Sequence, residues 1–382
     1  ARGSTPAREP ASMAGFQQPR RPPGAIPPEG RQWGGRRTVG IDKIISQVAQ
    51  IAPRLIDKTG RSMDSTPGFV FGVVTEEGKV VRGFGSGNIS TGQPPVAETL
   101  FGIGSVTKVF TGVILADAVR QGKVNLDVSA NTYLPDDLQL PSNKITLRQL
   151  VSHTSGLPNY PDNLRENRDM DRDGASDSNQ YSPGRNYSRQ HLAEWLASKP
   201  ALEFEPGQHS QYSNLGFGIL ALALQSKFRF SDFHSMNRSF ITQPLSMKRT
   251  QTNTGKLQSQ LNPNQAQGYA PNYGSLVPVP LSDMGVLEGA GELVSTANDL
   301  LLFLEGLTGL GTSAVTPAFR EASRPLVKLG DDAMAYGFKI RPSVKGGVYY
   351  IRSGSTAGYS AIILWRTNPK IGIVLLANRG NF

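Results

Sequence analysis

The chain has 382 residues, 38% of them hydrophobic and 18% charged, so it is too apolar for a disordered chain and long enough for one large or two intermixed domains. It contains no cysteine, which excludes disulfides, a thiolate nucleophile and metal sites with thiolate ligands. The net charge of +10 is uneven, because residues 1–39 hold seven Arg and two Glu and no basic helix follows. A basic tail is therefore favoured over nucleic-acid binding.

Residues 1–39 also hold seven Pro and no periodic apolar pattern, which predicts a disordered leader. No stretch reaches the roughly 18 apolar residues that a membrane span needs. No signal peptide is visible, and we expect that a targeting segment has been removed from this sequence.

The first ordered elements lie between residues 41 and 122. Apolar residues at three- and four-residue steps predict a helix over Ile41–Leu55, with Gly60 as its stop. A hairpin is expected from Gly68–Thr75 and Lys79–Phe84, then a strand over Leu100–Ile103. Ser105–Gln121 follows as a helix that Gly122 ends.

The middle and the end of the chain differ in pattern. Residues 123–284 predict a helical domain, with helices near 146–152, 189–197 and 214–226 and a polar insertion over 161–188. A capped helix follows over Ala297–Gly306. The last strands are expected at 336–340, 347–352, 358–365 and 371–377. Residues 41–122 and 285–382 would then share one antiparallel sheet flanked by helices, which is an α+β fold.

Ser105 and Lys108 form the first candidate for chemistry. They stand three residues apart at the start of a helix, so the amine can reach the hydroxyl. An oxyanion formed by attack of Ser105 would meet the unpaired N–H groups of the first turn. The spacing alone is weak evidence, and a solvent-facing Ser and Lys remain the alternative.

Tyr212 and Asn214 form the second candidate. Tyr has an ordinary pKa of about 10, and a unit charge at about 5 Å would lower it by roughly two units, so two cations could make it a base near pH 7. The Asn214 amide can accept from a Lys and donate to a substrate carbonyl. Simple packing of Tyr212 before a helix is the alternative.

The third candidate is Arg352-Ser353-Gly354-Ser355 at the end of a predicted strand. It offers a cation, a hydroxyl, a Gly that permits close backbone approach and an N–H for an oxyanion hole. The similar triplet Lys58-Thr59-Gly60 precedes the nucleophile and is interpreted as a helix end. The four His lack metal-ligand spacing, and His153 is interpreted as structural.

These three clusters, in this order, resemble the penicillin-recognising serine hydrolases: class C β-lactamases, DD-carboxypeptidases and family VIII esterases. The similarity extends over residues 41 to 382. Its further segments are Gly104–Phe110, Asn125–Asp127, Asn131–Pro135, Ile145–Leu150, Ser152–Leu157 and Ile371–Asn378. The resemblance implies the β-lactamase/transpeptidase-like fold.

The resemblance also implies roles for single residues. Ser105 would be acylated, Lys108 and Tyr212 would share the proton transfers, and Asn214 would orient Lys108 and the substrate amide. The N–H groups of Ser105 and Ser355 would form the oxyanion hole. No cofactor or metal is expected.

The sequence departs from the family pattern at two places. Arg352 stands where the family usually has Lys or His, and a guanidinium suits a carboxylate, so we expect Arg352 to receive the carboxylate of a β-lactam or peptide. The family usually continues into a final helix on the sheet, but this sequence stops at Phe382. An apolar strip is therefore expected beside the helix over 41–55, covered by a continuation of the chain, by a partner or by the leader.

The sequence leaves the activity open between a DD-peptidase, a β-lactamase, an esterase or amidase, and a non-catalytic penicillin-binding protein. The expected partner is a small-molecule or peptide substrate, with no nucleic acid and no transmembrane segment, and an oligomer stays open. The resemblance implies a periplasmic or secreted location.

Overall fold

The computed structural model describes residues 40–57, 59, 65–166, 181–182, 184–253, 264–344 and 346–382. The predicted leader over 1–39 and the triplet over 58–60, apart from Thr59, lie outside these residues, as does much of the polar insertion. Residues 39–382 form one compact unit. The predicted division of this part into a sheet domain and a helical domain stays a prediction.

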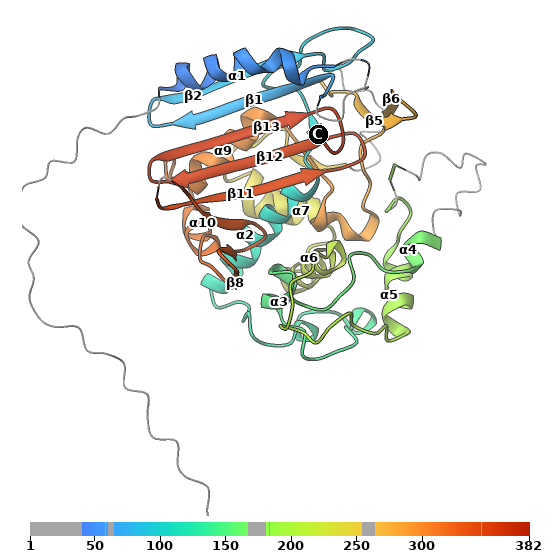
Figure 1. Ribbon diagram of the computed structural model, residues 1–382. Coiled ribbons are helices and arrows are strands. Elements are labelled where there is room, and N and C mark those ends of the chain that lie inside the picture. Colours follow the sequence, from blue (N-terminus) through green and yellow to red (C-terminus); the bar gives the residue numbers. More distant parts are fainter. Residues whose placement is uncertain are drawn as a thin grey trace, which may run out of the picture. The chain divides into compact units, whose positions relative to one another are not determined.

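An antiparallel sheet of eight strands forms the frame of the unit, with the order β2-β1-β13-β12-β11-β10-β9-β8 (Figure 1). Strands from near the two ends of the described residues meet where β1 pairs with β13. The strands are β1 (Gly68–Thr75), β2 (Gly78–Gly85), β8 (Val327–Leu329), β9 (Asp332–Met334), β10 (Lys339–Pro342), β11 (Val348–Ser355), β12 (Ser360–Thr367) and β13 (Lys370–Ala377).

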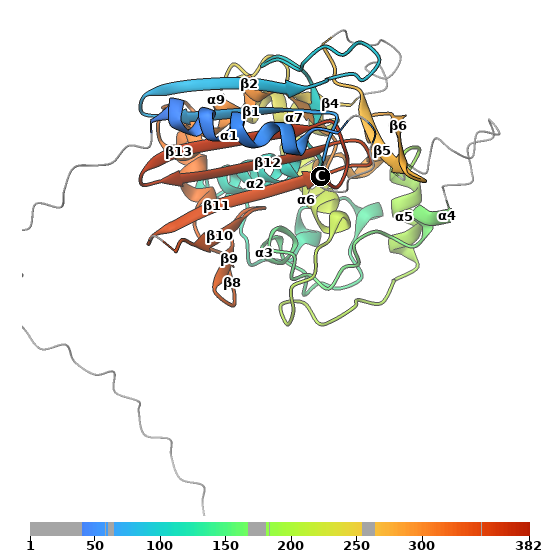
Figure 2. The same cartoon turned by 45° about the horizontal axis from the view of Figure 1, so that its top comes forward.

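Helices cover both faces of this sheet, and most of them lie on one side (Figures 1 and 2). The helix α9 packs on β1, β12 and β13, whereas α1 packs on β1 and β2 from the other side. The helices are α1 (Ile41–Leu55), α2 (Thr107–Arg120), α3 (Leu147–Val151), α4 (Asn163–Glu166), α5 (Arg189–Ala197), α6 (Asn214–Phe228), α7 (Phe233–Asn237), α9 (Ala297–Thr308) and α10 (Thr316–Ala322).

Two of the helices are buried on nearly every side. In α2 the buried residues include Val109, Phe110, Val113 and even Lys108, and α6 is buried from Asn214 to Leu224. A helix that is apolar all round belongs inside the core. Because α2 and α6 pack on each other, residues at their N-terminal ends can form one site.

Smaller elements complete the unit. The 3-10 turns η1 (Gly104–Val106) and η6 (Gly285–Ala290) flank α2, and a three-stranded sheet has the order β3-β7-β4. These strands are β3 (Phe101–Gly102), β7 (Leu293–Ser295) and β4 (Gln251–Thr252), and a hairpin is formed by β5 (Gly268–Asn272) and β6 (Ser275–Val279).

The predicted fold class is confirmed, and several predicted elements shift at their ends. The strand expected from Tyr336 begins only at Lys339, because residues 335–338 form a turn with Gly337 at φ +88°. The helix expected from Ser105 starts as the turn η1 and continues as α2 from Thr107.

The outer face of the sheet carries aliphatic side chains on β12 and β13, and those on β13 belong to the apolar cluster that α1 forms on this face. They are only partly buried, and the strand register places them side by side on β12 and β13. They are Ile362, Leu364, Ile371, Ile373 and Leu375. None of these five residues is exposed, and the strip expected beside α1, with whatever would cover it, stays a prediction.

Candidate active site

Ser105 and Lys108 lie at the junction of η1 and α2. Gly104 adopts φ +49°, a conformation that favours glycine, and turns the chain from β3 into η1. The Lys108 side chain is fully buried, and its Nζ lies 3.2 Å from Ser105 Oγ. Nζ also donates to Asn214 Oδ1 at 2.6 Å and to the carbonyl oxygen of Ala290. The amine is therefore held at the hydroxyl by two fixed acceptors.

Tyr212 reaches the same hydroxyl from the N-terminal end of α6. Its Oη forms a hydrogen bond with Ser105 Oγ, and Lys108 Nζ lies 4.8 Å from the centre of its ring. Ser213 caps α6 by accepting from the N–H of Gly216, which fixes the chain directly after Tyr212. The first two predicted clusters thus meet at Ser105 Oγ.

Arg352 approaches this group from β11. Its Nε donates to the Ser105 carbonyl oxygen at 3.0 Å, and its Nη2 donates to Tyr212 Oη at 2.9 Å. Only 8% of the residue is exposed. Two N–H groups of the guanidinium are thus used inside the protein. The expected contact with a substrate carboxylate stays a prediction, and the geometry favours a role toward Tyr212.

Burial and the neighbouring charges shift the pKa values of Lys108 and Tyr212. Burial lowers the pKa of Lys108 to about 8. Burial alone would raise the pKa of Tyr212, but the Lys108 and Arg352 cations outweigh it and lower this pKa to about 8. The two cations thus stabilise the Tyr212 phenolate, which can act as a base toward Ser105 near neutral pH.

The segment Ser353-Gly354-Ser355 splits between two faces of β11. Gly354 lies against the nucleophile, since a Cβ at this position would be 2.1 Å from the Ile103 oxygen and 2.8 Å from the Ser105 nitrogen. A Cβ on Gly104 would in turn be 2.9 Å from the Ser355 nitrogen. The backbones of Ser105 and Ser355 are therefore close enough to direct their N–H groups at one oxyanion. Ser353 is exposed and faces away from the group formed by Arg352 and Ser105.

A cavity of about 250 Å³ opens at this group. Ser105, Asn214 and Ser355 line it together with Tyr160, Met284 and further residues of the loops around them. The size fits a small molecule or a peptide end. Asn214, expected to orient Lys108 and the substrate, contacts both Lys108 and this cavity.

Sequence reasoning missed the groups that hold the predicted residues in place. Asn159 Oδ1 accepts from both the backbone N–H and the Nδ2 of Asn214, which leaves Asn214 Oδ1 for Lys108. The Ala290 carbonyl binds Lys108. Neither belongs to a recognisable motif, and a backbone carbonyl carries no signal in a sequence.

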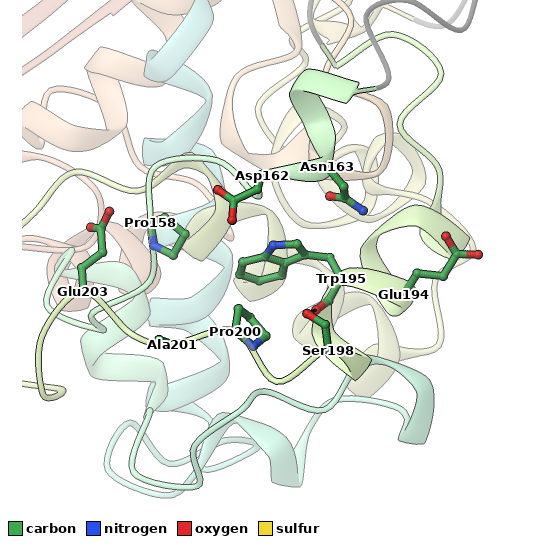
Figure 3. Close-up of a pocket in the computed structure, with 9 residues that line it drawn as sticks. All are labelled: Pro158, Asp162, Asn163, Glu194, Trp195, Ser198, Pro200, Ala201 and Glu203. Carbon is green, nitrogen blue, oxygen red and sulfur yellow. Dashed lines mark hydrogen bonds between the residues drawn. The ribbon is translucent and has the colours of Figure 1, made fainter.

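The described residues also form a larger cavity of about 590 Å³ away from this group (Figure 3). The Trp195 indole lies in it between Asp162 and Pro200, and Glu194 and Glu203 stand at its edges (Figure 3). The hydroxyl of Ser198 in this cavity donates to the Trp195 carbonyl oxygen at 2.7 Å, and no hydrogen bond among the described residues joins it to the carboxylate of Glu194 or Glu203. Size alone therefore does not mark the reaction centre.

Neither a metal-binding cluster nor a membrane-spanning helix is found in the part of the chain that the structure describes. No group of His, Asp and Glu there could hold a metal ion. No helix in this part is both long and apolar enough to span a membrane.

The chain is similar to known proteins in sequence and in fold. The sequence model described as Beta-lactamase matches residues 52–382. A beta-lactamase of Yersinia enterocolitica is 23% identical over 363 residues, which cover 85% of this chain and 84% of the relative.

Two solved structures share the fold. The D-alanine carboxypeptidase AmpC from Burkholderia cenocepacia has a TM-score of 0.71 and 22% identity, and the match covers 89% of this chain and 95% of that one. The octameric penicillin-binding protein homologue from Pyrococcus abyssi has a TM-score of 0.73 and 23% identity, and covers 90% of this chain and 74% of its own.

Proposed function

The chain belongs to the beta-lactamase family of penicillin-recognising serine hydrolases, and we propose that it forms an acyl-enzyme at Ser105 with β-lactams or D-alanyl-D-alanine peptides. One observation carries the proposal. Ser105 Oγ is in hydrogen-bond contact with both Lys108 Nζ and Tyr212 Oη at the wall of a cavity. Such an arrangement activates a hydroxyl as a nucleophile.

Acylation begins at the Ser105 hydroxyl. Tyr212, as phenolate, takes the proton from Oγ, and Oγ attacks the carbonyl carbon of the substrate. The N–H groups of Ser105 and Ser355 stabilise the oxyanion that forms. The bond to the leaving nitrogen breaks, and this nitrogen takes the proton from Tyr212. Lys108 and Arg352 stay protonated and stabilise the phenolate before and after the step.

Deacylation reverses these roles with water as the nucleophile. Tyr212 takes a proton from a water molecule, the hydroxide attacks the ester carbonyl, and the same two N–H groups stabilise the second oxyanion. The bond to Oγ then breaks, and Oγ takes the proton back from Tyr212. Because acylation is common to peptidases and lactamases, the rate of this second stage decides which activity the protein has.

The experiment that tests the proposal is labelling with a fluorescent penicillin, followed by timing of the loss of label. Lasting label indicates a peptidase or a penicillin-binding protein, and rapid loss indicates a β-lactamase. Absence of penicillin label together with hydrolysis of p-nitrophenyl esters would favour the esterase alternative. The p-nitrophenyl ester, which carries no carboxylate, thus distinguishes an esterase from an enzyme that acts on β-lactams or peptides.

Ser105→Ala is the decisive variant. It should abolish labelling by penicillin and by fluorophosphonate, while the melting temperature stays within a few degrees because the change is small. Ser90→Ala, at an exposed position in a loop, is the matched control and should label like the wild type. Label on a tryptic peptide that lacks residue 105 would contradict the mechanism.

We also propose a periplasmic or secreted location, as the family resemblance implies. The octameric relative from Pyrococcus abyssi supports an oligomer as the alternative to a monomer. Light scattering coupled to size exclusion separates the two states.

A further inference from the structure

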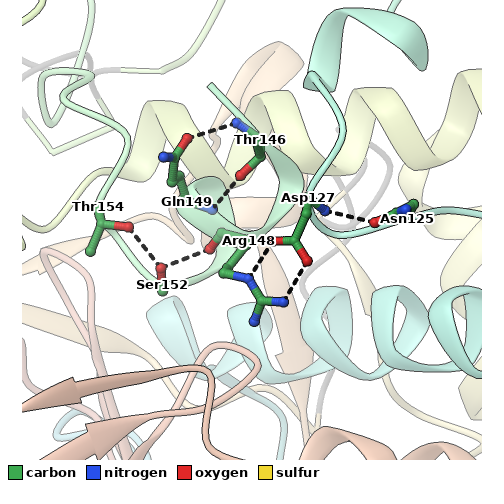
Figure 4. A network of polar contacts seen from close by, with 7 residues as sticks. All are labelled: Asn125, Asp127, Thr146, Arg148, Gln149, Ser152 and Thr154. Atoms are coloured by element: carbon green, nitrogen blue, oxygen red, sulfur yellow. Dashed lines mark hydrogen bonds and ion pairs between the residues drawn. The ribbon is translucent and has the colours of Figure 1, made fainter. Parts of the chain in front are cut away.

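His153 lies in a turn that the polar groups around α3 hold rigidly. The turn follows α3, and His153 adopts φ +61°, which is uncommon for a residue other than Gly. Ser152 Oγ donates to the Arg148 carbonyl at 2.7 Å and is within 2.9 Å of Thr154 Oγ1 (Figure 4). Arg148 in turn binds Asp127 with two hydrogen bonds (Figure 4). These hydrogen bonds therefore stabilise the unusual backbone conformation of His153.

This conformation lets His153 contact the chain on both sides of Tyr212. Its carbonyl oxygen accepts from the N–H of Gln211 at 2.8 Å, and its Nδ1 accepts from the N–H of Ser213 at 3.2 Å. The imidazole ring lies 4.6 Å from the Tyr212 ring, measured between their centres. His153 thus holds Tyr212 in place through two hydrogen bonds to the neighbouring backbone N–H groups and one ring contact.

We infer that His153 is a positioning residue for Tyr212 and acts in the neutral form that carries its proton on Nε2. The inference rests on the proposed function, because Tyr212 is the base there. The chemistry follows from Nδ1, which can accept from Ser213 only while it keeps its lone pair. Protonation would turn this acceptor into a donor facing another donor.

The surroundings keep the ring neutral. His153 is buried, and its Nε2 has no hydrogen-bond partner among the described residues. Burial lowers the pKa of His153 well below 6.5, and the Arg352, Lys108 and Lys339 cations lower it further. Phe217 and the Tyr212 phenol pack against the ring. An imidazolium would therefore stand among cations without a carboxylate that the structure pairs with it.

Two substitutions separate positioning from simple packing. His153→Gly removes the ring and the acceptor but keeps the backbone conformation, since Gly tolerates positive φ. His153→Asn tolerates this conformation too and places an amide oxygen near the position of Nδ1. Both variants therefore lack the imidazole ring, and only His153→Asn keeps an acceptor for the Ser213 N–H.

The readouts are the penicillin acylation rate as a function of pH and the titration of Tyr212. NMR of ¹³C-labelled tyrosine follows this titration without any substrate, and Tyr212→Phe assigns the signal among the 11 tyrosines. In His153→Gly we expect a 10- to 100-fold slower acylation and a Tyr212 pKa moved toward 10, since the phenol is no longer held at its two cations. His153→Asn should restore the rate to within about fivefold of wild type.

Equal impairment of the two variants would overturn the inference, as would a wild-type Tyr212 titration in His153→Gly. If His153→Gly fails to fold, His153→Asn alone decides: a wild-type titration supports the inference and a displaced one overturns it. A wild-type protein that no penicillin or ester acylates would refute the proposed function. The tyrosine titration would still test the role of His153 in that case.

Discussion

Replacing Arg352 by Gln removes one of the two cations that contact Tyr212. The guanidinium Nη2 lies 2.9 Å from Tyr212 Oη, and the guanidinium carbon is 5.3 Å from the ring centre. With about 4 Å between the charges and an effective dielectric constant of about 20, the attraction is about 4 kcal/mol, or about three pKa units. Because 38% of Tyr212 is exposed, solvent screening reduces this effect. We expect the Tyr212 pKa to rise by about one to two units.

The assay is the second-order acylation rate with a fluorescent penicillin between pH 5 and pH 11. The phenolate is the active form, so the wild-type rate should rise with pH through about 8, where the pKa of Tyr212 lies. A pKa raised by one to two units reduces the phenolate fraction at pH 7 by roughly 10- to 100-fold. In Arg352→Gln the rise should therefore move to higher pH, and the rate should recover there.

Arg352→Lys keeps a cation on this strand and is the matched control, with an expected rise near the wild-type pH. A neutral ester separates the role toward Tyr212 from contact with a substrate carboxylate. Equal losses for penicillin and p-nitrophenyl acetate indicate an effect on Tyr212, whereas a KM increase for penicillin alone indicates carboxylate binding. A rate in Arg352→Gln that falls equally at every pH would refute the electrostatic reasoning.

Two further predictions concern the groups that support the site. Gly354→Ala should reduce the acylation rate at least 100-fold, because the new Cβ would be 2.1 Å from the Ile103 oxygen. Gly87→Ala is the control: its Cβ would have ordinary contacts, so this variant should be labelled normally in the same assay. Asn159→Ala should slow acylation about 10-fold, because the Asn214 amide loses the acceptor that holds it. The unpaired amide should also lower the free energy of unfolding by about 1–3 kcal/mol. Unchanged labelling kinetics in this variant would contradict that role.

Much of the fold could be predicted because its elements carry strong local patterns. The helix over Ile41–Leu55 and the strand over Gly68–Thr75 have the predicted bounds, since apolar spacing and flanking turns define both. The strands β8 and β9 were not predicted, because three residues are too few to show an alternating pattern. Pairing across the sheet, which fixes these short strands, cannot be seen in one segment.

The types of residue at the candidate site could be predicted from spacing at helix starts. Ser105 with Lys108 and Tyr212 with Asn214 each stand where an apolar helix begins, and both pairs meet in the structure. Their supports could not be predicted, because Asn159 is far from Asn214 in sequence and in no motif. A residue recruited by tertiary contact leaves no local pattern.

The face of β11 to which the Arg352 side chain points could not be predicted from the sequence. Successive side chains of a strand point to opposite faces, so either Arg352 or Ser353 faces Ser105, and their order in the chain does not say which. The structure decides through the register, which pairs Arg352 with the buried Ile363 and Ser353 with the partly exposed Ile362. A slip of one residue would turn the guanidinium to the outer face and leave Tyr212 with Lys108 as its one contacting cation among the described residues. The pKa of Tyr212, and with it the proposed base, therefore depends on the register of β11 with β12 as much as on the residues themselves.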